Sequence, residues 1–255
     1  MADRLISGLV RYAAARAGRP TGLRFTERQL YYELCRVLLP AHLLPRRLPF
    51  TVPALIPIGV FEGWLHRCGS IDGLLDPPES ATSELGNSTT EDDLFDYALP
   101  RILVCQSSAV ADMLRANSLP MESACPVISV GELPLDPGLV RMLDATSVTD
   151  EGARVYVLHD DSSVGLALPQ TVAETGGLPE SAIVVPIGLR RSQTAPLHLT
   201  RSGWREESCV EVESVAPAVL LRSVHRLVRD VHRRREPLVD LPAARSAGFL
   251  TWPQR

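Results

Sequence analysis

Polar side chains that could do chemistry follow three apolar runs in the second half of the chain. They are Gln106-Ser-Ser, Gly131-Glu-Leu-Pro and His159-Asp-Asp-Ser-Ser. In the last group His159 stands beside Asp160 and Asp161, so the imidazole is a candidate ligand or base. The same two carboxylates could instead cap a helix. Near the start of the chain Arg28 precedes Tyr32 by one helical turn. This spacing puts a cation on the same face as a phenol whose ordinary pKa is about 10.

The elements that must position these groups alternate between two patterns. Short apolar runs occur at 102–105, 127–130, 154–158 and 182–187. Stretches with helical spacing lie between them at 109–116, 137–143 and 164–175. Apolar strands alternating with helices are typical of a parallel sheet covered on both faces. In such sheets the functional groups lie beyond the carboxyl ends of the strands, where the three polar groups are expected.

Helices are expected before this region, at the start of the chain. Leu5, Ile6, Leu9, Val10 and Ala13 predict a first helix over 3–17. A capping box of Thr26 and Gln29 begins a second helix that ends near Pro40. We expect four parts: a helical or winged-helix-like unit at 1–67, an acidic linker or loop at 68–98, the α/β domain at 99–195, and a strand with a basic helix at 196–255.

The strand-end segments resemble those of a toprim domain. That family has a glutamate after its first strand and Asp-x-Asp after its third, and these acids bind magnesium. Here Gln106 stands at the glutamate position. When the third segment is matched on Gly165, Asp160 holds the first acid and Ser162 replaces the second. The resemblance therefore implies a degenerate magnesium site of Asp160, Asp161 and Gln106, in which the metal is bound weakly or not at all.

Two further segments resemble the topoisomerase VI A subunits and their relatives, which include the meiotic double-strand-break enzyme. Thr26-Glu-Arg-Gln-Leu-Tyr-Tyr is similar to that group's Thr-x-Arg-x-[Ile/Leu]-Tyr-Tyr, and the segment 209–221 is similar to the strand before its final helix. The resemblance implies that Tyr32 attacks a phosphodiester with Arg28 as its phosphate partner. In this group the tyrosine of one protomer meets the metal site of another, which implies a homodimer. Alternatively, Tyr31 and Tyr32 simply pack the helix.

Composition limits the partners. The 26 basic and 30 acidic residues give a net charge of −4, which argues against a chain that coats nucleic acid nonspecifically. A local basic surface is still expected on the C-terminal helix, whose phosphate-contacting residues would be Arg222, Arg226, Arg229 and Arg233.

Five scattered cysteines without a CxxC pair predict neither a disulfide framework nor a zinc site. No apolar run approaches the roughly 20 residues of a membrane span. We therefore expect a cytoplasmic, nucleoid-associated protein.

Two hypotheses follow. In the first, the chain is a DNA-associated toprim protein that acts as a non-catalytic or partner-dependent subunit of a DNA-processing or defence complex. The replacement of carboxylates by Gln106 and Ser162 favours it. In the second, the chain is a magnesium-dependent strand-cleaving enzyme with Tyr32 as nucleophile. An unrelated flavodoxin-like α/β domain is a third interpretation, and its ligand would bind elsewhere along the strand ends.

Overall fold

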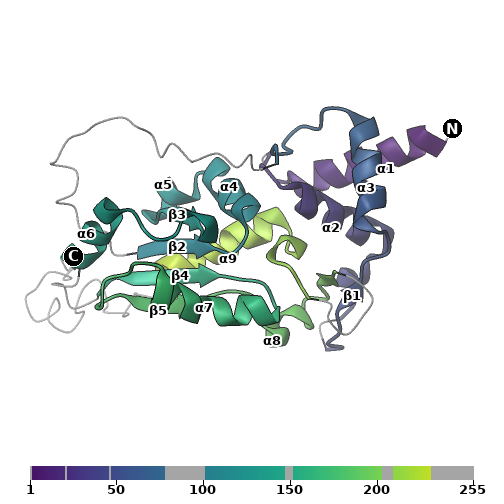
Figure 1. The fold of residues 1–255 in the computed structure, drawn as a ribbon. Helices are drawn as coiled ribbons and strands as arrows, with labels where there is room; N and C mark the ends of the chain where they lie inside the picture. Colours follow the sequence, from purple (N-terminus) through teal and green to yellow (C-terminus); the bar gives the residue numbers. More distant parts are fainter. Residues whose placement is uncertain are drawn as a thin grey trace, which may run out of the picture.

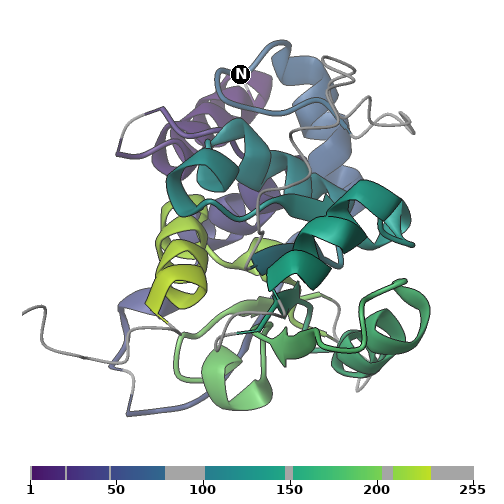
Figure 2. The ribbon, with the colours of Figure 1, turned by 90° about the vertical axis from the view of Figure 1, so that its left-hand side faces the viewer.

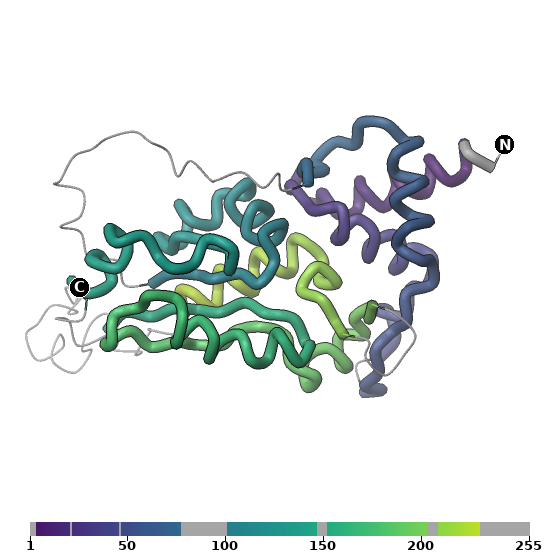
Figure 3. The backbone as a smooth tube through the Cα atoms, viewed as in Figure 1, coloured from purple at the N-terminus to yellow at the C-terminus, as the bar shows by residue number. Residues whose placement is uncertain are grey.

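The computed structural model describes residues 2–20, 22–45, 47–77, 101–146, 152–202 and 209–230. Figure 1 shows an N-terminal group of helices at one end of the molecule and a sheet flanked by helices at the other. The tube view in Figure 3 shows the same division along the chain path. The expected acidic linker at 68–98 falls largely outside the described residues, which resume at Arg101.

A four-stranded parallel sheet forms the centre of the larger part. Its strands are β2 (Arg101–Cys105), β3 (Val127–Ser129), β4 (Arg154–Leu158) and β5 (Ile183–Pro186). They run in the order β3-β2-β4-β5, and each neighbouring pair is parallel. The expectation of a mixed α/β fold built on a parallel sheet is thus confirmed. Since β2 and β4 are neighbours, the loops that follow Cys105 and Leu158 lie side by side.

Helices cover both faces of this sheet. They are α4 (Ser108–Ala116), α5 (Leu119–Ser123), α6 (Pro137–Thr146), α7 (Ser163–Thr175) and α9 (Pro217–Asp230). Alternate strand residues face opposite ways, so Leu103 and Tyr156 share a core with α4, α5 and α9, whereas Ile102 and Val155 share one with α6 and α7. Figure 2 shows α9 and α7 on opposite sides of the sheet.

The N-terminal unit consists of α1 (Ala2–Ala17), α2 (Glu27–Leu38) and α3 (Ile58–Cys68), with the short 3-10 helix η1 (Ala41–Leu43). Its own apolar core includes Phe25, Leu30 and Phe61, all fully buried. The predicted capping box is present: Gln29 N donates to Thr26 Oγ1, and Thr26 N donates to Gln29 Oε1. The two-residue strand β1 (Val52–Pro53) pairs in parallel with β6 (Thr200–Arg201), from the far end of the chain, so it does not form a local winged-helix hairpin.

The chain after β5 returns to the N-terminal unit. It passes through α8 (Arg191–Thr194) and β6 to the 3-10 helix η4 (Val212–Ser214), which leads into α9. Within the described part of 196–255, β6 is a strand and α9 a helix, whereas the segment after Cys209 forms no regular strand. Val210 makes only an isolated bridge with Asp161, and Ser214 N then bonds back to Glu211 O. This turn tightens the backbone, so that η4 lies against α2 rather than along the sheet.

Candidate functional site

The predicted nucleophile Tyr32 lies at the junction of the two parts of the molecule. Its hydroxyl donates to Glu211 Oε2 at 2.8 Å, and Arg28 Nη1 donates to the other oxygen, Oε1, at 2.6 Å. Both donors come from one face of α2, as their four-residue spacing predicts. Glu211 comes from the segment that immediately precedes η4. One carboxylate therefore links helix α2 to the C-terminal part of the chain.

Tyr32 is buried, with only 1% of its surface exposed. Burial raises the pKa of its phenol above the ordinary value, and the neighbouring Glu211 carboxylate raises it further, whereas Arg28 lowers it by less. Tyr31 is also buried, packs on Phe61, and donates its hydroxyl to Ile56 O. Burial, with smaller effects of Cys35, raises its pKa to about 12. Both phenols are therefore held in the neutral form. Both rings belong to the apolar core of the N-terminal unit.

The predicted metal ligands Asp160 and Gln106 form hydrogen bonds at the same junction. Gln106 Oε1 accepts the backbone N–H of Asp160 at 2.9 Å, which joins the ends of β2 and β4. Asp160 Oδ1 accepts the backbone N–H of Val212 at 2.6 Å, which anchors η4 to the end of β4. Burial raises the pKa of Asp160, although the bond from Val212 opposes this. Gln106 Oε1 and Asp160 Oδ1, which were expected to bind magnesium, thus each accept a hydrogen bond from a backbone N–H.

The remaining polar groups after β4 have separate structural roles. Ser162 caps α7 by accepting the N–H of Gly165, so neither Asp160 nor Asp161 is the cap. Asp161 accepts a hydrogen bond from Thr194 on α8 at 3.2 Å. His159 is buried, and its Nδ1 lies 2.9 Å from Asp160 O. The alternative that Asp161 is a helix cap is therefore wrong.

A third acid, Glu213, is buried in η4, next to the junction. It is 4% exposed, and its Oε1 accepts the hydroxyl of Ser107, the cap of α4, at 2.7 Å. Burial raises the pKa of Glu213 to about 7; the hydrogen bond from Ser107 opposes this, while the nearby charges of Asp160 and Glu211 add to it. Close to neutral pH this carboxyl is therefore partly protonated, which limits repulsion among the three acids.

These residues do not fit a magnesium centre as they stand. Within the described residues, no group of three or more His, Cys, Asp or Glu side chains is arranged to hold a metal ion. Gln106 supplies a neutral amide oxygen, already bonded to Asp160 N. Asp161 points to Thr194, and Glu211 is shared between Arg28 and Tyr32. Magnesium requires oxygen ligands in near-octahedral geometry, whereas one oxygen of each expected ligand already accepts a hydrogen bond from a protein donor.

The predicted nucleic-acid contacts lie elsewhere, on α9. Arg222, Arg226 and Arg229 are exposed on this helix, whereas Arg233 lies outside the described residues. Arg222 Nε donates to Ala218 O within the helix, and Arg229 Nη1 lies 3.5 Å from His225 Nε2. The structure thus separates two groups. Arg28 and Tyr32 bind Glu211, whose neighbour Val212 is bonded to Asp160, and the α9 arginines form a different surface.

Two residues of the junction, Glu211 and Glu213, were not predicted as site residues. The segment that carries them was singled out because it resembles the stretch before the family's final helix. The signal that could have found them is the alternation Val210-Glu-Val-Glu213, which puts two carboxylates on one side of an extended segment. Their partners, 179 residues away on α2 and 106 away at Ser107, depend on the tertiary fold.

No family model, curated protein or solved structure matches this chain. Among the described helices, none combines the length and the apolar character that crossing a membrane requires.

Proposed function

We propose that this chain is a DNA-associated, non-catalytic subunit of toprim and topoisomerase VI A-like type, acting with protein partners in a DNA-processing complex. The proposal rests on one observation: the residues expected to be catalytic are hydrogen-bonded to other parts of the protein. Tyr32, Arg28, Asp160 and Gln106 all hold the N-terminal helices, η4 and the strand ends together. A nucleophile for a phosphodiester must be reachable by DNA, whereas Tyr32 is 1% exposed.

Association with DNA is supported by charge rather than by the strand-end residues. The exposed arginines of α9 present guanidinium groups, which bind phosphate through paired hydrogen bonds. With a net charge of −4, the chain depends on such local surfaces to attract a polyanion. The alternative function, strand cleavage by Tyr32, has one observation in its favour: the 2.8 Å bond to Glu211 is the arrangement of a hydroxyl beside a general base.

Two measurements on the purified protein test the proposal. DNA binding should persist in EDTA, because contacts between arginines and phosphates need no metal ion. Titration calorimetry with magnesium should show at most millimolar affinity, and Asp160→Asn should leave that heat unchanged. Asp72→Asn is the control, because it changes an exposed carboxylate that is distant from Asp160 in the sequence. Tight magnesium binding lost in Asp160→Asn but kept in Asp72→Asn would instead support the enzyme.

A further inference from the structure

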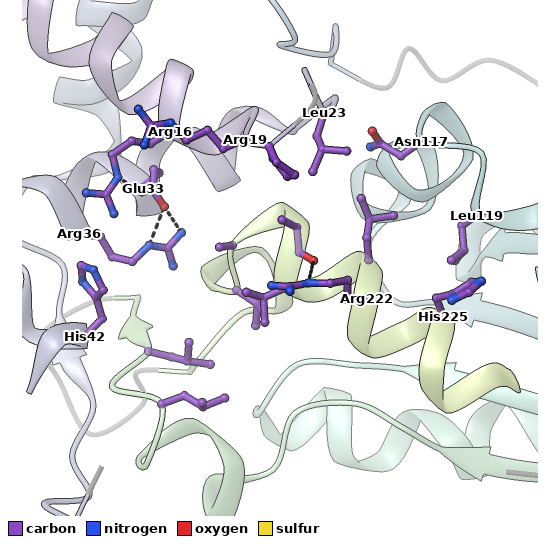
Figure 4. A pocket seen from close by; sticks show the side chains of 18 of the residues that line it. Arg16, Arg19, Leu23, Glu33, Arg36, His42, Asn117, Leu119, Arg222 and His225 are labelled. Atoms are coloured by element: carbon purple, nitrogen blue, oxygen red, sulfur yellow. Dashed lines mark hydrogen bonds and ion pairs between the residues drawn. The ribbon is translucent and has the colours of Figure 1, made fainter. Parts of the chain in front are cut away.

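A groove of about 1010 Å³ runs between the N-terminal helices and α9. One wall is formed by the end of α1 and by α2, and the other by α5, α9 and the segment 196–199. Figure 4 shows Arg16, Arg19 and Arg36 on the first wall, facing Arg222 on α9. The groove is separate from the junction: neither Tyr32 nor Asp160 lines it.

The groove carries an excess of positive charge. It is lined by four arginines and two glutamates, together with three histidines. One of the acids, Glu33, is already neutralised, because it accepts hydrogen bonds from both Arg16 Nε and Arg36 Nε at 2.8 Å. Arg36 also donates to Ser214 O, so its position is fixed before any ligand arrives. Arg36 is thus engaged and only 10% exposed, so the exposed guanidinium groups of Arg19 and Arg222 are the ones available to phosphate.

The base of the groove is apolar. Leu119, Leu199, Val215 and Val219 line it beside the arginines. A ligand that fits the groove must therefore combine negative charge with apolar surface. Unpaired nucleotides have both, because their bases stack on apolar and guanidinium surfaces while their phosphates pair with arginine.

We infer that this groove binds single-stranded nucleic acid, with the phosphates toward Arg19 and Arg222 and the bases toward the apolar base of the groove. The inference rests on the proposed association with DNA and names the form of DNA that is recognised. Duplex DNA fits less well, since its bases are stacked inside the helix and cannot cover the exposed Val219. A duplex would instead contact the outer arginines of α9, such as Arg229.

The test is fluorescence anisotropy with a labelled thymidine oligonucleotide of about 12 residues and a duplex of the same length. Arg19→Glu and Arg222→Glu should each weaken binding of the single strand about tenfold or more. The matched controls are Arg4→Glu, on the same helical unit as Arg19, and Arg141→Glu, which reverses an exposed charge on α6. Neither control residue lines the groove. Thermal melting checks that all four variants fold.

Each outcome has a defined meaning. A stronger affinity for the single strand, lost in the two groove variants but kept in the two controls, supports the inference. Equal losses in groove and control variants, or an equal or stronger affinity for the duplex, overturn it and leave the proposed DNA association standing. If neither DNA binds, the DNA association itself fails and the inference fails with it.

Discussion

The hydroxyl of Tyr32 and the carboxylate of Glu211 are joined by a hydrogen bond of 2.8 Å between residues 179 positions apart. This bond, with the parallel one from Arg28, fastens the N-terminal helices to the segment that leads into α9. The residue expected to attack DNA is therefore part of the connection between the two halves of the molecule.

Tyr32→Phe should reduce stability, because it removes a hydrogen bond to a charged group while leaving the packing intact. The expected loss is about 2 kcal/mol, roughly 4–8 °C in Tm for a chain of this size. Tyr12→Phe is the matched control, since Tyr12 is half-exposed on α1. Thermal melting of both variants gives the comparison. Equal Tm values for Tyr32→Phe and Tyr12→Phe would show that the bond to Glu211 contributes nothing.

Glu213→Gln should change how stability depends on pH. The pKa of Glu213 is raised to about 7 in the folded protein, from an ordinary value of 4.5. Between these two pH values the folded state binds the proton and the unfolded state does not, so stability falls as pH rises from about 4.5 to about 7 and is constant above that. A shift of this size corresponds to roughly 3 kcal/mol at pH 8. Glutamine still accepts the hydrogen bond from Ser107 but carries no charge.

The variant should therefore melt several degrees above the wild type at pH 8 and close to it at pH 4. Glu122→Gln, which neutralises an exposed carboxylate on α5, is the control and should show no such trend. Denaturant unfolding at several pH values measures the effect. A Glu213→Gln protein that is less stable than the wild type at pH 8 would contradict the prediction that ionisation of the buried Glu213 carboxyl destabilises the folded state.

Gly165→Ala should destabilise the protein, because an added Cβ would overlap the backbone oxygen of Asp160 and approach Gln106 Oε1 to 2.9 Å. The start of α7 packs too closely on the end of β4 for a methyl group. Overpacking of this kind costs about 1–3 kcal/mol. Gly8→Ala is the opposite case: it is helical with open space around it, so it should gain about 0.5–1 kcal/mol. The two variants should move Tm in opposite directions.

Features encoded by local spacing could be predicted from the sequence, because they depend on neighbours along the chain. The strands and their covering helices follow from apolar periodicity, and the start of α2 follows from Thr26 and Gln29. The pairing of β1 with β6 could not be predicted, since it joins Val52 to Thr200 and each strand has only two residues. Such short strands leave no periodic pattern.

The candidate site was predicted in part for the same reason. The loops after β2 and β4 meet because their strands are neighbours, so Gln106 and Asp160 were expected together and are bonded. The path that brings Glu211 to Tyr32 depends on how η4 packs against α2, which no local pattern encodes. The expected ligands are consequently engaged by protein groups that the sequence did not identify as partners.

The most direct test of the central claim is a nicking assay with supercoiled plasmid DNA and the purified wild-type protein in magnesium. The account predicts that the plasmid stays supercoiled while the protein binds DNA, because Tyr32 is buried and bonded to Glu211. Magnesium-dependent nicking by the wild type, abolished in Tyr32→Phe and retained in Tyr12→Phe, would contradict it and establish the chain as a strand-cleaving enzyme.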